Sequence, residues 1–272
     1  MKKRILALAL VLGLSLTLTA CGGKKQAVTL KVGATPTPHA EILEQVKPIL
    51  AEQGIDLQIV EYTDYVTPNT AVEEGENDAN YFQHNSYMND FNADRNTHLV
   101  SVANIHYEPF GIYVGKAKDL TDLSDLPDGA SIAIPNDATN EARALYLLEA
   151  EGLITLDHDR PFAETTVLDV VENPKDLKLQ ELEAAMLPNS LNDVDCAVIN
   201  GNYALGAGLS VKDSLALESA ESEAGTTYAN IICVKEGNEN NEAVQALVAA
   251  LKSDAIRDYI NETYSGAVLP VF

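Results

Sequence analysis

The sequence predicts an α/β fold of two lobes, with mostly parallel sheets flanked by helices. Short apolar runs alternate along the chain with stretches in which apolar residues recur at helical spacing. The alternation comes as two consecutive series without a low-complexity linker between them. Alternating strands and helices favour a parallel sheet that is covered on both faces. A chain of 272 residues is long enough to give each lobe its own core.

The N-terminal segment has the pattern of a secretory signal. Three basic residues precede the apolar run "ILALALVLGLSLTLTA", which is shorter than the ~20 residues that a membrane-spanning helix needs. The run ends in "LTAC", which resembles a bacterial lipobox and predicts that Cys21 carries the lipid. An ordinary signal peptide with an incidental cysteine is the alternative. We therefore expect a signal peptide at 1–20, a lipidated tether at 21–28, and a protein anchored to the extracytoplasmic face of the cell membrane.

The charge of the chain excludes one class of partner. The chain has 18 Lys and Arg residues, of which three belong to the signal. The remaining 15 are far outnumbered by the 41 Asp and Glu residues. Such an acidic surface disfavours nucleic acid. Cys196 and Cys233 lie in apolar runs without CxxC spacing, which predicts buried free thiols rather than a disulfide or a metal-thiolate site.

The first series of elements begins after the tether. Apolar spacing and the stop at Gly54 predict a helix at 39–54. In "TPNTAVEEG", Thr67 is an N-cap candidate and Pro68 suits the first helical position, which predicts a helix at 67–75. The expected strands of this series are 28–34, 55–62, 79–84 and 99–107.

The second series begins with a strand at 128–137 and a helix at 139–154. Residues 165–173, 178–186, 195–201 and 202–208 continue the alternation of strand and helix. A strand at 227–235 and helices at 240–253 and 254–264 complete the chain. With crossings at 106–116 and 226–235, we expect lobe 1 at 29–109, lobe 2 at 110–228 and a return to lobe 1 at 229–272.

Enzyme motifs are absent from the sequence: there is no GxSxG, Walker loop, GxGxxG or HExxH. His84 and His106 lie at the ends of predicted strands, where ligands bind in parallel α/β sheets. Two imidazoles without a third ligand make a weak metal site. His39, His98 and His158 are expected at solvated or loop positions.

Several polar residues follow strands or begin helices. Asn140 and Arg143 open a predicted helix, where free N–H groups and the guanidinium suit a carboxylate. A surface ion pair is the alternative for Arg143. Asn200 and Asn202 directly follow an apolar strand, and they suit either a ligand or a turn. Asn230 interrupts an apolar strand and must find partners if it is buried, a ligand ammonium or carboxylate among them.

The stretch "DANYFQHNSYMNDF" at 78–91 holds four of the sixteen Tyr and Phe residues. Phe82 and His84 alternate with Tyr81 and Gln83, so the two pairs are expected on opposite faces of a strand. Phe82, Tyr87 and Tyr65 would form an apolar wall for a small ligand, although core packing is the simpler explanation for Phe82 alone.

Six blocks of the sequence, in order, resemble the methionine-binding lipoproteins of the NlpA family, the substrate-binding components of methionine ABC importers. The blocks are "VGATPTPHAEILE", "DYVTPNTAVEEGENDANYFQHNSYM", "IHYEPFGIYVGK", "LPDGASIAIPNDATNEARAL", "VLDVVENPKDLKLQELEAAMLP" and "DVDCAVINGNYAL". The resemblance covers nearly the whole chain after the signal. It implies the two-lobe fold of periplasmic binding proteins, with methionine in the cleft between the lobes.

The resemblance also implies roles for particular residues. Tyr65, Phe82 and Tyr87 would contact the methionine side chain, and Arg143 would bind the carboxylate. The full set of ligand residues that it implies is Tyr65, Phe82, His84, Tyr87, His106, Asn140, Arg143, Asn200, Asn202, Tyr228 and Asn230. It implies a permease and its ATPases as partners, and neither a cofactor nor catalysis.

The ligand itself stays open. The first loop reads "TPTPH", where some relatives differ. L-methionine, D-methionine, a methionine-containing dipeptide and another neutral amino acid all remain candidates, as do a metal-binding protein and a lipoprotein without a functional pocket.

Overall fold

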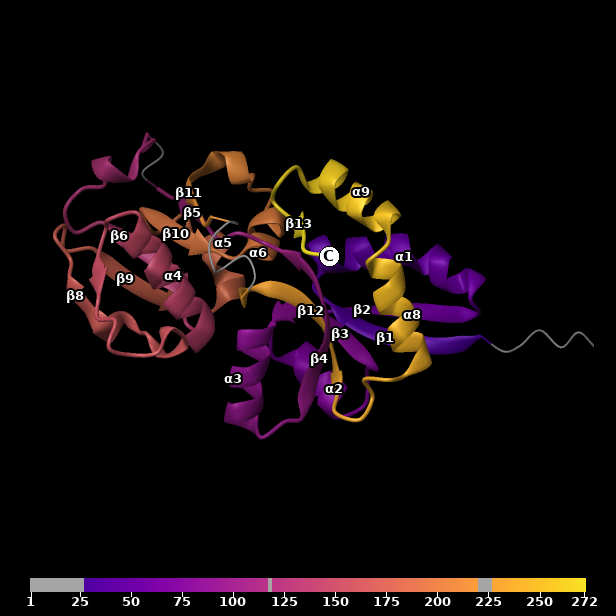
Figure 1. The fold of residues 1–272 in the computed structure, drawn as a ribbon. Coiled ribbons are helices and arrows are strands. Elements are labelled where there is room, and N and C mark those ends of the chain that lie inside the picture. The colour runs from indigo at the N-terminus through magenta and orange to yellow at the C-terminus, as the bar shows by residue number, and fades with distance from the viewer. Residues whose placement is uncertain (1–26, 117–118, 220–226) are drawn as a thin grey trace, which may run out of the picture.

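The computed structural model describes residues 27–116, 119–219 and 227–272. The predicted signal peptide and Cys21 lie outside the described residues. Figure 1 shows the chain arranged around two sheets, with the C-terminal helices folded back beside the first helix. Within the described residues, no helix has the length and apolar character needed to cross a membrane.

The first sheet, sheet A, is mixed. Its order is β13-β4-β12-β3-β1-β2, with β1 (Val28–Ala34) parallel to β2 (Ile55–Glu61) and β3 (Ala79–His84). The strand β12 (Ala229–Lys235) lies antiparallel between β3 and β4 (Leu99–Tyr107), and β13 (Leu269–Pro270) is antiparallel to β4. The strands β1 to β4 therefore all run in one direction, and the two C-terminal strands run in the other.

The second sheet, sheet B, has the order β11-β5-β10-β6-β9. The strand β6 (Ser131–Pro135) is parallel to β9 (Lys178–Leu182) and β10 (Cys196–Ile199). The strand β5 (Gly111–Val114) is antiparallel to both β10 and β11 (Ser214–Leu217). A short pair, β7 (Thr155–Leu156) and β8 (Val170–Glu172), stands apart. The strands β5 and β12 are antiparallel to their neighbours, and they are also the strands at which the chain passes from one sheet to the other. The predicted parallel direction holds for the other strands of sheet B and for β1 to β4.

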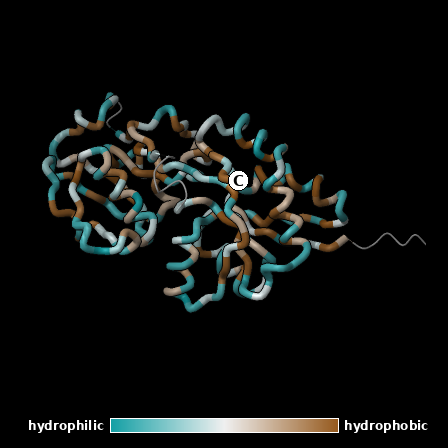
Figure 2. Tube along the Cα trace, viewed as in Figure 1, coloured by the Kyte–Doolittle hydropathy of each residue, from teal (hydrophilic) through white to brown (hydrophobic). Residues whose placement is uncertain are grey.

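Helices cover both faces of sheet A. On one face lie α1 (Glu41–Glu52), α8 (Glu242–Leu251) and α9 (Asp254–Tyr264), which share one apolar core with β1, β2 and β3. On the other lie α2 (Thr67–Glu73) and α3 (Asn85–Arg95), packed over Phe82 and Cys233. Figure 2 shows hydrophilic residues gathered along the outer helices and loops, as such layers require.

Sheet B is covered in the same way. The helix α4 (Ala138–Ala150) packs on one face, and the short helices α5 (Leu187–Ser190) and α6 (Gly201–Gly206) pack on the other. Helical turns occur at Pro36–Ala40, Leu123–Asp125, Phe162–Glu164, Val167–Asp169, Ala184–Met186 and Val211–Asp213. The helices α4 and α6 begin where β6 and β10 end, and their first residues share a cleft with the C-terminal end of β3.

Most predicted elements are present, and the differences include one strand and one helix. The continued alternation is wrong at 178–186, where Lys178–Leu182 is a strand at the edge of sheet B. The helix α3 was not predicted. It begins because the His84 ring accepts the backbone N–H of Tyr87, and it ends at Asn96 in a left-handed conformation. Cys196 and Cys233, the cysteines of the described residues, are free and buried, as expected.

Candidate functional site: a cleft between the two sheets

A small cleft opens where the two sheets meet. Its empty volume is about 340 Å³, part of which is continuous with solvent. The lining residues are Tyr65, Phe82, Gln83, His84, Tyr87, Glu108, Phe110, Asn140, Arg143, Asn200, Gly201, Asn202 and Asn230.

Nine of the eleven predicted ligand residues line this cleft, and His106 and Tyr228 do not. His106 is fully buried behind Glu108. The Tyr228 ring lies 4.3 Å from the guanidinium of Arg143 and packs against His84, so it supports the cleft from a neighbouring cavity.

The structure adds Gln83, Glu108, Phe110 and Gly201 to the lining. Gln83 is one of three buried amides that bond to one another: its Nε2 donates to Asn69 over 2.6 Å, and Asn80 donates to Asn69 over 2.8 Å. These hydrogen bonds satisfy the amide groups that Asn80 and Gln83 place in the buried strand β3. Glu108 was not among the predicted ligand residues, and its place in the crossing at 106–116 is the sequence signal that could have indicated it.

Three rings form the apolar wall that the sequence predicted. The centroid of Tyr65 lies 5.6 Å from that of Phe82 and 5.7 Å from that of Tyr87. Phe82 is 4% exposed and also belongs to the core under α3. Packing and ligand contact are therefore compatible for the same ring.

Hydrogen bonds cross the cleft and hold it closed. The Tyr65 hydroxyl donates to Oδ1 of Asn202 over 2.6 Å, and the Tyr203 hydroxyl donates to the carbonyl of Thr63 over 3.1 Å. His84 Nε2 lies 3.3 Å from Oδ1 of Asn140 at the start of α4. Each pair joins a residue of the sheet A half to one of the sheet B half, so the structure represents a closed form.

Arg143 is buried, with 4% of its surface exposed, which rules out the alternative of a surface ion pair. Its Nη2 donates to the carbonyl of Glu108 over 2.8 Å, and Nε and Nη2 both bond to the carboxylate of Glu218. Phe110 packs on the guanidinium, with its centroid 4.0 Å from Cζ. Arg143 also lines the cleft, so its guanidinium is placed to meet a ligand there.

A chain of amides leads from α4 to α6. The side chain of Asp137 caps α4 and accepts a bond from Asn140 Nδ2 over 2.7 Å. Oδ1 of Asn140 accepts from Nδ2 of Asn200 over 3.2 Å. Oδ1 of Asn200 is buried and has no hydrogen-bond partner within the described part of the chain. Asn140 therefore orients its neighbours, and Asn200 is left with a free acceptor.

His39 is placed differently from the prediction of a solvated loop position. It is 1% exposed, because the turn at 36–40 folds inward and the ring is held at both nitrogens. Nδ1 lies 2.7 Å from the Thr35 hydroxyl, and Nε2 lies 3.0 Å from Oδ1 of Asn230 and 3.3 Å from Oε1 of Glu108. Asn230 accepts through its oxygen, so its Nδ2 is the group available to a ligand. His98 and His158 are exposed, as predicted.

Burial controls the protonation of the site. It lowers the pKa of His84 and His106 to about 3 and that of His39 to about 4, so all three are neutral at neutral pH. Burial also raises the pKa of the Glu108 carboxyl, an effect that His39, Arg143 and the backbone N–H of Asn202 partly oppose.

The chain matches one family model and many known proteins. The model described as NlpA lipoprotein matches residues 30–272. The chain is 39% identical to the methionine-binding lipoprotein MetQ of Bacillus subtilis, over 100% of this chain and 99% of that one. A nutrient-binding protein from Burkholderia cenocepacia bound to methionine has a TM-score of 0.84 and 40% identity, covering 89% of this chain and 100% of that one. The substrate-binding protein of a methionine transporter from Streptococcus pneumoniae also has a TM-score of 0.84, with 35% identity over 90% of this chain and 96% of that one.

Proposed function

The chain belongs to the NlpA lipoprotein family, and we propose that it captures methionine outside the cytoplasm and delivers it to a membrane ABC importer. The proposed activity is binding without catalysis. Closure of the two halves over the ligand would stabilise the complex, because a ligand that contacts both halves has a higher affinity for the closed form.

The observation that carries the proposal is the free acceptor of Asn200. A buried acceptor without a partner is costly in a folded protein, at about 1–3 kcal/mol, so it indicates a donor that a ligand supplies. An ammonium group is such a donor. The guanidinium of Arg143 and Nδ2 of Asn230, in the same cleft, suit a carboxylate, and together these groups fit an amino-acid zwitterion.

The aromatic wall supports a thioether side chain. Sulfur contacts with aromatic rings contribute about 0.3–1.5 kcal/mol each, and Tyr65, Phe82 and Tyr87 offer three rings. A charge-assisted hydrogen bond to the carboxylate would add about 1.5–3 kcal/mol. Such terms together suit a micromolar or tighter dissociation constant, which corresponds to about 8 kcal/mol.

The test is isothermal titration calorimetry on protein that has been unfolded and refolded to remove retained ligand. L-methionine, D-methionine and leucine are compared on one preparation. The proposal expects saturable one-to-one binding of methionine, much tighter than that of leucine. Absence of both heat and thermal stabilisation with methionine would refute it and would favour a different small ligand.

The lipid anchor and the importer are part of the same proposal. Cys21 in "LTAC" would carry the lipid and hold the protein at the membrane that contains the permease. Mass spectrometry of the mature N-terminus would check this. A Cys21→Ala chain that still carries lipid, or a wild-type chain without it, would contradict the anchor without affecting the ligand.

A further inference from the structure

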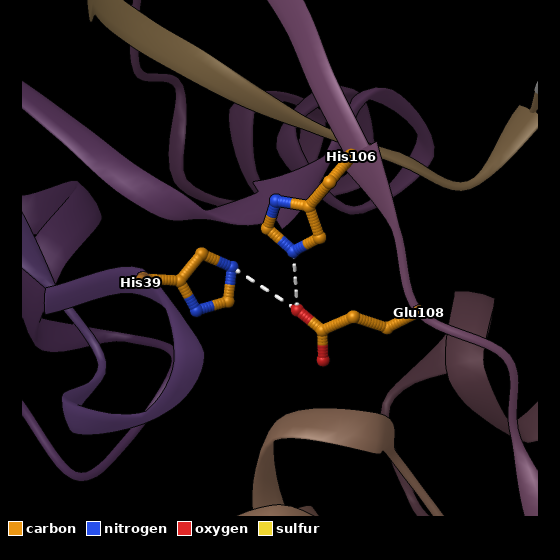
Figure 3. A group of neighbouring side chains, drawn as sticks. All are labelled: His39, His106 and Glu108. Atoms are coloured by element: carbon orange, nitrogen blue, oxygen red, sulfur yellow. Dashed lines mark hydrogen bonds and ion pairs between the residues drawn. The ribbon is translucent and has the colours of Figure 1, made fainter. Parts of the chain in front are cut away.

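The Glu108 carboxylate lies between two imidazole rings. Figure 3 shows His39 and His106 both pointing their Nε2 atoms at one carboxylate oxygen, with the second oxygen directed away from the rings. Oε1 of Glu108 is 2.6 Å from Nε2 of His106 and 3.3 Å from Nε2 of His39. All three residues are at most 5% exposed. A cluster so deeply buried has contacts that are set by the protein rather than by solvent.

The neighbours of the rings decide which nitrogen carries the proton. Nδ1 of His39 meets the Thr35 hydroxyl, and Nδ1 of His106 meets the Tyr81 hydroxyl. A hydroxyl can donate to Nδ1, whereas an ionised carboxylate only accepts. Each neutral ring is therefore protonated at Nε2 and donates toward Glu108. His39 shares its proton between Glu108 and Oδ1 of Asn230.

These donors do not cancel the charge of Glu108. Burial keeps both imidazoles neutral. The nearby cation, Arg143, pairs with Glu218 and bonds only to the backbone carbonyl of Glu108. The titratable and charged groups that face Glu108 are His39, His106, Arg143, Tyr65 and Tyr81. A buried carboxylate with hydrogen bonds but without a salt bridge remains available to a cation.

The second oxygen lies on the side of the cleft. A Cβ placed on Gly201, which lines the cleft, would lie 2.8 Å from Oε2 and 2.7 Å from Cβ of Glu108. A glycine is therefore required for this approach. Oε2 thus lies at the start of α6, where the backbone N–H of Asn202 also bonds to the Glu108 carboxylate.

We propose that His39 and His106 are positioning residues, which hold Glu108 as an oriented anion through neutral N–H donors so that Oε2 accepts the ammonium group of the ligand. The proposal rests on the proposed function and deepens it, because it makes a free amino group a requirement for tight binding. A fixed cation in place of the imidazoles would compete with that ammonium.

The same three side chains form the group, among the described residues, that could hold a metal ion. The geometry favours hydrogen bonds instead. Two ligands of a tetrahedral zinc ion, each at roughly 2.0–2.1 Å from it, lie roughly 3.3 Å apart. The 2.6 Å between Nε2 of His106 and Oε1 of Glu108 is a direct hydrogen bond.

The first experiment compares two ligands by calorimetry: L-methionine and 4-(methylthio)butanoate, which lacks only the ammonium group. His106→Phe removes the donor, His106→Gln keeps an N–H donor, and His98→Gln is the exposed control. We expect His106→Phe to weaken methionine binding about tenfold and to leave binding of the butanoate nearly unchanged. His106→Gln should retain most of the preference. Equal losses for both ligands in His106→Phe would overturn the proposal. Should that variant not fold, His39→Phe takes its place.

The second experiment needs no ligand. Carbon-13 NMR of the carboxyl groups follows the titration of Glu108, whose signal is assigned by its loss in Glu108→Gln. Loss of a donor should raise the pKa of Glu108 in His106→Phe relative to wild type, and an unchanged pKa would refute the positioning role. Stoichiometric binding of Zn²⁺ by wild type, lost in His39→Gln, would instead identify a metal site. If wild type binds neither methionine nor the butanoate, the proposed function fails, and the titration still tests the two histidines.

Discussion

The hydroxyl of Tyr65 and the side-chain oxygen of Asn202 are 2.6 Å apart, although the residues lie on opposite sides of the cleft and 137 positions apart in sequence. Tyr65 precedes α2 in the sheet A half, and Asn202 lies in α6 of the sheet B half. Tyr65 also packs against Tyr203, with 5.0 Å between centroids. One aromatic side chain thus both borders the cleft and holds it closed.

Tyr65→Phe keeps the ring and removes this hydrogen bond. We expect methionine to bind several-fold more weakly, since one net hydrogen bond contributes about 0.5–1.5 kcal/mol, all of it present only in the closed form. Calorimetry measures the affinity, and small-angle scattering with and without methionine measures closure. Tyr62→Phe, which removes a hydroxyl that meets Asn77 outside the cleft, is the matched control. Equal affinities for Tyr65→Phe and wild type would show that the bond does not stabilise the closed form.

Arg143→Ala should weaken methionine binding at least tenfold and also destabilise the fold. The guanidinium pairs with Glu218, which is 10% exposed, and removal of one partner of a buried ion pair costs about 3–5 kcal/mol. Thermal unfolding and calorimetry separate the two effects. The double variant Arg143→Leu, Glu218→Leu should regain stability but not binding. Full binding by the double variant would exclude Arg143 from the ligand site.

The affinity for methionine should fall as the solution is acidified. The ammonium group needs an ionised Glu108, and burial raises the pKa of that carboxyl above its ordinary value. Because the folded-state pKa is raised, protonation of Glu108 occurs at a higher pH than for an exposed glutamate, and binding is lost as pH falls through it. Calorimetry across this range, in buffers of different ionisation enthalpy, should detect proton release on binding. Glu108→Gln should bind weakly at every pH and release no proton through this group, so a wild-type pH profile in this variant would contradict the assignment.

Much of the fold could be predicted from the sequence because its signals are local. The runs at 28–34, 79–84 and 99–107 are strands over the predicted residues. Hydrophobic spacing and helix signals need no knowledge of distant residues. The segment at 178–186 carries the helix formers Leu, Glu and Ala, yet pairing with β6 makes its first half a strand, since tertiary contacts override a weak propensity.

The residues of the candidate site could likewise be predicted only where the signal is local in the sequence. Arg143, Asn200 and the aromatic residues could be predicted, because their positions at the ends of strands and the starts of helices are visible in the sequence. His39 could not be, because its burial depends on Asn230, which is 191 positions away. Glu108 was missed for a related reason: the two imidazoles that bond to it come from the turn at 36–40 and from β4. Only the folded chain brings these groups together.

The last test is a substitution at Gly201, because it moves the Glu108 carboxylate without removing any ionisable group. In Gly201→Ala the new Cβ would lie 2.7 Å from Cβ of Glu108 and 2.8 Å from its Oε2, so the carboxylate must move while every ionisable group remains. We expect methionine affinity to fall about tenfold, with a smaller loss for 4-(methylthio)butanoate. Gly206→Ala is the matched control: it lies in the same short helix, and nothing is within 4 Å of its added Cβ. That control should bind methionine as wild type does. If Gly201→Ala also bound methionine like wild type, recognition of the ligand's ammonium group would not depend on the position of Glu108.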